Sequence, residues 1–142
     1  MLFKDPAKLR KHIEDALSDL NREMVIQSQA KLGEINPRDT GRMRSSWFAQ
    51  VGSASDAVAP EGTDRPNDDA KLLPLQFKED VHLTNNLPYA QPVALGINLP
   101  PSWGGENRVW RASQSWYKDF RDATMPKIRK TSEIIIKNRY EL

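Results

Sequence analysis

The chain has 142 residues, of which 38% are hydrophobic and 28% charged, which is typical of one folded domain and excludes a disordered or fibrous protein. Its 21 basic and 19 acidic side chains give a formal net charge of +2, far from the one-sided balance that phosphate-driven binding usually requires. The absence of cysteine excludes disulfides, thiolate metal sites and a cysteine nucleophile. We expect a single domain over residues 1–142.

The N-terminus does not have the pattern of a targeting segment. Its first twenty residues mix charged with apolar side chains and lack the apolar stretch that a secretion signal needs. The longest undiluted apolar run, Ile134 to Ile136, is far shorter than the roughly 20 residues that span a bilayer. We therefore expect a protein of the cytosol with no membrane partner.

Residues 1–35 predict a long amphipathic helix. Asp5 before Pro6 is typical of an N-cap with proline in the first helical position, and Asn36 before Pro37 is typical of a helix end. Apolar residues recur at steps of three or four and form one stripe: Leu9, Ile13, Leu17, Leu20 and Met24. The simpler interpretation is a core helix with a solvated outer face, and the alternative is a helix between subunits.

Residues 38–47, RDTGRMRSSW, predict a short second helix. Asp39 or Thr40 can cap it, and Met43 and Trp47 lie four apart on its buried side. Its arginines then face outward: Arg38, Arg42 and Arg44. Alternation after Trp47 predicts a strand near 47–52.

Residues 53–71 predict a long mobile loop, since they hold few large apolar side chains but two prolines, one glycine and several acids. The acids Glu61, Asp64, Asp68 and Asp69 lack the spacing of a calcium-binding loop. Such a loop often orders on assembly, so we expect it to contact a partner.

The next segments predict a strand and a short turn or helix. Phe77, Val81 and Leu83 share the apolar side of an extended segment over 77–84, which Asn85 and Asn86 end. A short turn or helix follows over 88–95, and consecutive prolines and glycines make 98–105 irregular.

Residues 109–142 return to helical spacing. Trp116 and Phe120 are expected core anchors, and Pro126 is expected to kink or break the helix. Ile128, Ile135 and Ile136 continue an apolar stripe among lysines and arginines, which gives a basic tail.

Signals for catalysis are absent from the sequence. The two histidines, His12 and His82, lie far apart without metal-ligand spacing, and neither a nucleophile elbow nor a phosphate-binding glycine loop is present. We expect no catalytic role, no metal and no cofactor. Carboxylates that converge from distant positions stay possible, because a single sequence does not exclude them.

Two segments in a fixed order carry a family resemblance: NPRDTGRMRSSW over 36–47 and HLTNNLPYAQPVALG over 82–96, with LPPSWGGENRV behind them. Together they resemble the tail-completion and neck proteins of tailed bacteriophages. In that family an N-terminal helix leads into P-x-D-T-G-R-L-R-x-S, and a strand then ends in N-x-x-x-Y-A-x-x-V-E-Y-G before a proline-containing loop and a C-terminal helix. The chain departs at Ala94 and Leu95, where the family more often has an acid and an aromatic residue.

The resemblance implies an α+β fold in which a small, mostly antiparallel sheet is flanked by a long N-terminal helix and a C-terminal helix. It implies a homo-oligomeric ring, commonly six-fold, that joins connector to tail around the DNA channel as a neck, tail-completion or tail-terminator protein. The implied partners are further copies of the chain, neighbouring connector, tail-tube or terminator proteins, and DNA passing through the lumen. The implied location is the virion, after assembly in the host cytoplasm.

We assign candidate interface or lumen positions on this basis: Arg38, Arg42, Arg44, Asp64, Asp68, Asp69 and Trp103. Structural positions of the family motifs are Asp39, Thr40, Gly41, Tyr89, Ala90 and Gly96. Two alternatives stay open. One is a small nucleic-acid-binding protein that uses its arginines and basic C-terminal helix, and the other is an enzyme of unrecognised type.

Overall fold

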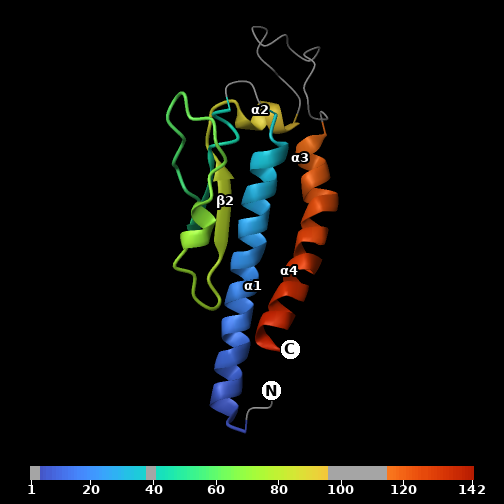
Figure 1. The fold of residues 1–142 in the computed structure, drawn as a ribbon. Helices are drawn as coiled ribbons and strands as arrows, with labels where there is room; N and C mark the ends of the chain where they lie inside the picture. Colours follow the sequence, from blue (N-terminus) through green and yellow to red (C-terminus); the bar gives the residue numbers. More distant parts are fainter. Residues whose placement is uncertain (1–3, 38–40, 96–114) are drawn as a thin grey trace.

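The computed structural model describes residues 4–37, 41–95 and 115–142 (Figure 1). The elements in chain order are α1 (Pro6–Ile35), β1 (Trp47–Val51), the 3-10 turn η1 (Asp69–Leu72), β2 (Val81–Asn85), α2 (Ala90–Leu95), α3 (Trp116–Asp119), the π-helical turn η4 (Phe120–Thr124) and α4 (Met125–Tyr140). The two strands form an antiparallel sheet, with the long α1 and the C-terminal helix beside it. The predicted α+β class is therefore confirmed. Several predictions lie outside the described residues: those for Arg38, Asp39, Thr40, Gly96, Trp103 and the loop 98–105.

The predicted ends of α1 are confirmed. The Asp5 carboxylate accepts a hydrogen bond from the Ala7 N–H at 3.0 Å, and the Asn36 N–H donates to the Leu32 carbonyl at 3.0 Å. Near this end a Cβ on Gly33 would lie 2.9 Å from the Pro66 Cβ. The glycine therefore lets the following loop pack closely against the last turns of α1.

The apolar stripe of α1 is only partly buried. Leu9, Ile13 and Leu17 are 40%, 40% and 46% exposed, and the first turns of α1 project beyond α4 and the sheet (Figure 1). The buried residues of α1 are instead Ala16, Ser28, Gln29, Leu32 and Gly33. The prediction that the whole stripe faces the core is wrong for its N-terminal half.

The segment predicted as a second helix is a tight turn. Gly41 has φ +86°, the Ser45 N–H donates to the Gly41 carbonyl at 3.2 Å, and Trp47 already begins β1. Met43 and Trp47 are both buried, as predicted, although they come from a turn and a strand. A positive φ is incompatible with a helical start, and this prevents a longer helix here.

β1 pairs with β2 in a register that joins Trp47 to Asn85 and Val51 to Val81. The strand predicted near 47–52 is thus confirmed. The second strand begins at Val81, four residues later than predicted, because Lys78 has φ 69° and turns the chain just before it.

The C-terminal helical region is continuous through Pro126. The π-helical turn η4 ends just before α4, in which Pro126 takes one of the first two positions. A π-turn rearranges the hydrogen bonds that proline would otherwise break, so no chain break results. Of the predicted kink or break at Pro126, the break is therefore wrong, while the π-helical turn interrupts the regular α-helix just before this proline.

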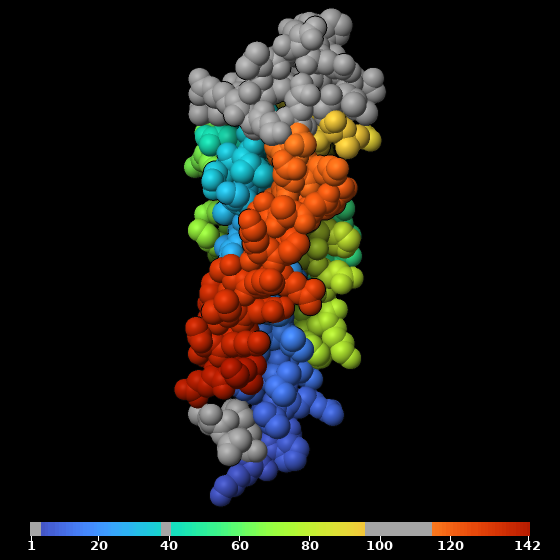
Figure 2. All heavy atoms as spheres, turned by 90° about the vertical axis from the view of Figure 1, so that its right-hand side faces the viewer, coloured from blue at the N-terminus to red at the C-terminus, as the bar shows by residue number. Residues whose placement is uncertain are grey.

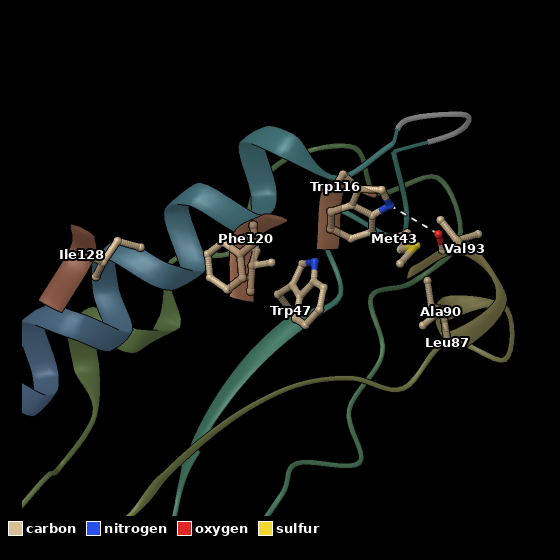
Figure 3. Packing of buried hydrophobic residues seen from close by; sticks show 9 residues of the cluster. Met43, Trp47, Leu87, Ala90, Val93, Trp116, Phe120 and Ile128 are labelled. Carbon is tan, nitrogen blue, oxygen red and sulfur yellow. Dashed lines mark hydrogen bonds between the residues drawn. The ribbon is translucent and has the colours of Figure 1, made fainter. Parts of the chain in front are cut away.

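The core lies where α1, the sheet, α2 and the C-terminal helix meet (Figure 3). Trp116 and Phe120 are buried, as predicted. Both buried indoles are satisfied: Trp116 Nε1 donates to the Val93 carbonyl at 3.3 Å and Trp47 Nε1 to the Asn36 side chain at 2.9 Å. The cluster consists of Leu32, Met43, Trp47, Leu87, Ala90, Val93, Trp116, Phe120 and Ile128.

Candidate functional site

The arginines of the turn at 41–45 bind the loop that follows β1. Arg44 Nε donates to the Asp64 carboxylate at 2.7 Å, and Arg44 Nη2 to the Asp64 carbonyl at 2.9 Å. Arg42 Nε donates to the Ala59 carbonyl at 2.9 Å. The prediction that Arg42 and Arg44 face outward is wrong, since their side chains are only 25% and 22% exposed. Their contact with a partner stays a prediction.

The two serines of the same turn also anchor the loop. Ser46 Oγ accepts from the Ala59 N–H at 3.1 Å, and Ser45 Oγ accepts from the Arg65 N–H at 2.8 Å. Both hydroxyls donate back to carbonyls of the turn. These roles escaped the sequence analysis, because the partners lie 13 and 20 residues away along the chain.

Gln29 fixes the far end of the loop from inside α1. Its side chain is 2% exposed, donates to the Trp47 carbonyl at 2.9 Å and accepts from the Ala70 N–H at 3.1 Å. Asp69 accepts from Gln29 and from the Ala49 N–H. Asp69 therefore bonds internally, whereas the Asp68 side chain is 77% exposed beside Lys71. The mobility of the loop 53–71 stays a prediction, but both its ends are tied to the body.

The remaining motif residues lie at the α2 end of the molecule. Ala90 is buried in the core cluster, and Tyr89 packs against that cluster. The Ala90 N–H donates to the Leu87 carbonyl at 2.9 Å. Their roles as structural positions of a family motif stay predictions.

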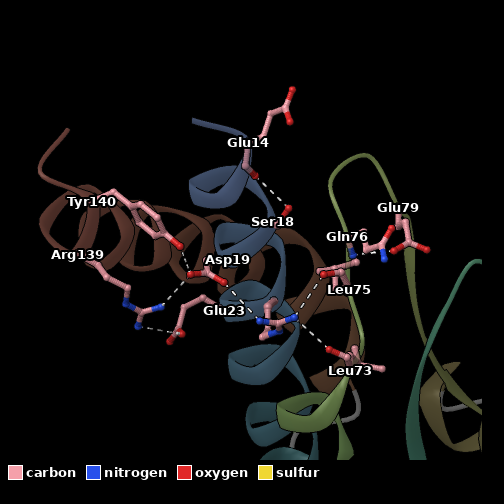
Figure 4. A network of polar contacts seen from close by, with 11 residues as sticks. Glu14, Ser18, Asp19, Glu23, Leu73, Leu75, Gln76, Glu79, Arg139 and Tyr140 are labelled. Atoms are coloured by element: carbon pink, nitrogen blue, oxygen red, sulfur yellow. Dashed lines mark hydrogen bonds and ion pairs between the residues drawn. The ribbon is translucent and has the colours of Figure 1, made fainter. Parts of the chain in front are cut away.

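A polar network joins α1 to the end of α4 (Figure 4). The Tyr140 hydroxyl donates to the Asp19 carboxylate, and Arg139 lies 3.8 Å from the same carboxylate. Burial, with the hydrogen bond to Asp19, raises the pKa of Tyr140 to about 12. His12 Nε2 lies 2.8 Å from the Tyr140 carbonyl, so this histidine holds the two helices together. His82 lies within β2, as expected.

A mainly apolar groove of about 340 Å³ lies between α1, the sheet and the C-terminal helix. Met24 and Val25 of α1 form one wall, and Val81 and Leu83 of β2 form another. The C-terminal helix closes the third side with Tyr117, Phe120, Arg121 and Met125. The groove can accept an apolar side chain from outside.

The outer edge of β2 lies beside this groove. The Gly52 N–H donates to the Asp80 carbonyl at 2.8 Å. The backbone N–H and C=O groups of even-numbered residues therefore bond between the two strands, and those of odd-numbered residues point away from the partner strand. On the outer edge of β1, the Gln29 side chain donates to the Trp47 carbonyl, and the Asp69 side chain accepts from the Ala49 N–H. The outward groups of Val81 and Leu83 have no hydrogen-bond partner in the described part of the chain, which leaves β2 with an open edge.

Within the described ranges, no three of the metal-binding residue types gather into a possible ion site, and no helix has the length and apolarity to cross a bilayer. No protein-family model, curated protein or solved structure matches the chain.

Proposed function

We propose that this protein is a subunit of a homo-oligomeric ring at the head-to-tail junction of a tailed bacteriophage. The observation that carries the proposal is the exposed half of the α1 stripe. Leu9, Ile13 and Leu17 follow each other at steps of four on one helical face, and each is at least 40% exposed. A single exposed leucine is ordinary, but an aligned apolar set on a projecting helix is typical of an interaction surface.

Neighbouring residues extend this surface, which we name the α1 stripe surface and define as Leu9, Ile13, Leu17 and Phe77. Phe77 lies with Leu9 and Ile13 along one shallow groove. A helix that buries its apolar face only on binding supports the inter-subunit alternative for α1. The motif resemblance supplies the phage context.

The near-neutral net charge of +2 suits a ring through which DNA passes. A lumen must let DNA slide, whereas strong phosphate binding by many one-sided charges would hold it. Such a subunit works by holding neighbours in place, without a chemical step.

The experiment is reconstitution with the connector and tail-tube proteins of the same virus, followed by electron microscopy. We expect an added ring layer on the connector with the native chain and none with Ile13→Glu. The matched control is Leu95→Glu, because Leu95 is also a half-exposed apolar residue, at 52%, but lies in α2. Native chain that never decorates the connector, or equal decoration by both variants, contradicts the proposal.

A second candidate is binding of nucleic acid by the C-terminal helix, favoured by exposed lysines such as Lys127 and Lys130. Arg42 and Arg44 support this candidate less, since both bond to the loop. Binding of duplex DNA by the isolated chain that weakens steeply with salt would favour it, and no binding at low salt would exclude it.

A further inference from the structure

The loop over 53–72 carries excess negative charge. Its acids are Asp56, Glu61, Asp64, Asp68 and Asp69, and its bases are Arg65 and Lys71, so two positive charges against five negative give −3. Asp64 and Asp69 bond internally, whereas the Glu61 and Asp68 side chains are 91% and 77% exposed and lie 3.9 Å from Arg42 and 3.5 Å from Lys71. The loop therefore carries an excess of acids, of which Glu61 and Asp68 are exposed members of surface ion pairs.

The C-terminal helix from Trp116 to Tyr140 carries excess positive charge. Seven bases (Lys118, Arg121, Lys127, Arg129, Lys130, Lys137 and Arg139) against three acids (Asp119, Asp122 and Glu133) give +4. Lys118, Lys127 and Lys130 are exposed and have no ion-pair partner in the part of the chain that the structure describes. This helix is a positive surface with unused cations.

The acidic loop ends in an apolar knob, Leu72, which is 86% exposed. The backbone on both sides of it is fixed: the Ala70 N–H donates to Gln29 at 3.1 Å, and Arg22 Nη2 donates to the Leu73 carbonyl at 3.0 Å. A side chain presented on a fixed backbone loses less entropy when it docks. Leu72 is thus preorganised to enter a pocket.

The apolar groove lies beside the positive helix. It is lined by Val25, Leu83 and Tyr117, with Arg121 beside them. The groove therefore has an apolar interior that suits an apolar knob, and its one charged lining residue, Arg121, lies 3.0 Å from Asp122.

The acidic loop and the C-terminal helix lie on opposite sides of α1. Figure 1 shows the acidic loop, in green, to the left of α1 and the C-terminal helix, in orange and red, to its right. Figure 2, viewed from the right-hand side of Figure 1, shows the C-terminal helix in front. Leu72 is 86% exposed, so it does not fill the groove of its own chain.

We propose that a second copy of this chain docks head to tail, with its acidic loop on the C-terminal helix of the first copy and its Leu72 in the apolar groove. This inference rests on the proposed ring and names one contact that closes it. Different surfaces of the two copies meet, and a repeated contact of this kind closes into a ring when the rotation between copies allows it. The opposite charges orient the copies, and the leucine supplies apolar burial.

The test is disulfide trapping in the full chain, which contains no native cysteine. A variant with both Leu72→Cys and Arg121→Cys should give, on oxidation, a ladder of covalent dimers, trimers and larger species. Each single variant should give no covalent species larger than the monomer, because its thiol would meet no partner thiol in the contact. A ladder limited to dimers, no cross-link at high concentration, or dimers from Leu72→Cys alone would overturn the head-to-tail contact.

Leu72→Ser should weaken self-association about tenfold or more, since a leucine side chain leaves the interface, whereas Leu95→Ser should not. Raised ionic strength should weaken the native contact further. This result can be separated from the phage function. A double variant that forms ladders but never binds the connector would support the head-to-tail contact and contradict the phage function. A double variant that decorates the connector without cross-linking there would support the phage function and contradict the head-to-tail contact.

Discussion

Two constraints at position 41 favour glycine over every other residue type. The φ of +86° is strained for a side chain, and a Cβ there would lie 1.7 Å from the Asp64 carboxylate oxygen. Gly41→Ala must therefore displace Asp64 from Arg44. We expect a loss of about 3 kcal/mol in the free energy of unfolding, measured by chemical denaturation.

Gly62 is the matched control for Gly41. It has nearly the same φ, +84°, but a Cβ there meets nothing within 4 Å. Gly62→Ala should cost only the backbone strain, about 1 kcal/mol. Equal losses for the two variants would show that the contact with Asp64 contributes nothing.

Gln29 is the buried residue with the most long-range polar contacts on α1. Gln29→Met keeps the size of the side chain but leaves the Ala70 N–H without its acceptor and removes one of the donors to Asp69. We expect a loss of about 2–4 kcal/mol and faster hydrogen exchange at Ala70. Gln27→Met is the control, because Gln27 bonds only to Glu23 on the same helix. Unchanged exchange at Ala70 would rule out this anchoring role.

At the scale of single residues, the sequence predicted the local roles best. Asp5 and Pro6 act within two residues of their own positions, and the Asn36 N–H ends α1 by bonding to Leu32 one helical turn back, so their local patterns were sufficient. Gln29, Ser45 and Ser46 contact residues at least 13 positions away, and a polar residue gives no local sign of such a partner.

Among the elements, α1 and α4 are joined by the Tyr140–Asp19 hydrogen bond. The pKa of Tyr140 is raised from 10.0 in the unfolded chain to about 12 in the folded one, chiefly by burial. This contribution to stability is complete below pH 10.0 and is lost as pH rises toward about 12, because the unfolded chain releases its proton first.

As pH rises from 10.0 toward about 12, the free energy of unfolding of Tyr140→Phe should therefore fall less steeply than that of the native chain. The measurement is urea denaturation at a series of pH values, for the native chain and the variant. Tyr117→Phe is the control, since it removes a phenol outside the α1–α4 contact. Parallel curves for the native chain and Tyr140→Phe would show that Tyr140 does not cause the decline.

Elements with a long apolar periodicity were predicted well. Elements whose bounds depend on the backbone dihedral angles of one residue or turn were predicted poorly. The length of α1 and the burial of Trp116 and Phe120 followed from spacing alone. The turn at Gly41, the late start of β2 after Lys78 and the π-turn before Pro126 did not, because each depends on a backbone geometry that the residue types only permit.

At the scale of the whole molecule, the most informative difference between prediction and structure is the exposed N-terminal half of the apolar stripe of α1. Periodicity reports that a helix has an apolar face, but not whether the same chain covers it. Ile13→Glu should leave the free energy of unfolding within about 0.5 kcal/mol of the native value, since the side chain is already 40% exposed. Thermal and urea unfolding measure this. A large loss would mean that the face is covered within the chain.

The opposite charges of the acidic loop and the C-terminal helix also appear only at this scale. The nearly balanced net charge of +2 conceals a loop of −3 and a helix of +4. Their separation to opposite sides of the molecule required the fold, since sequence order alone does not place residues 53–72 and 116–140 relative to each other.

The central claim is that the chain works by assembling with copies of itself on a neighbouring ring. Under the proposed phage function, the most direct measurement is the molar mass by light scattering of the chain mixed with the connector and tail-tube proteins of the same phage. We predict particles whose mass exceeds that of the partner alone by several multiples of 16.2 kDa, the mass of one chain. A chain that stays at 16.2 kDa in the presence of both partners would contradict the account.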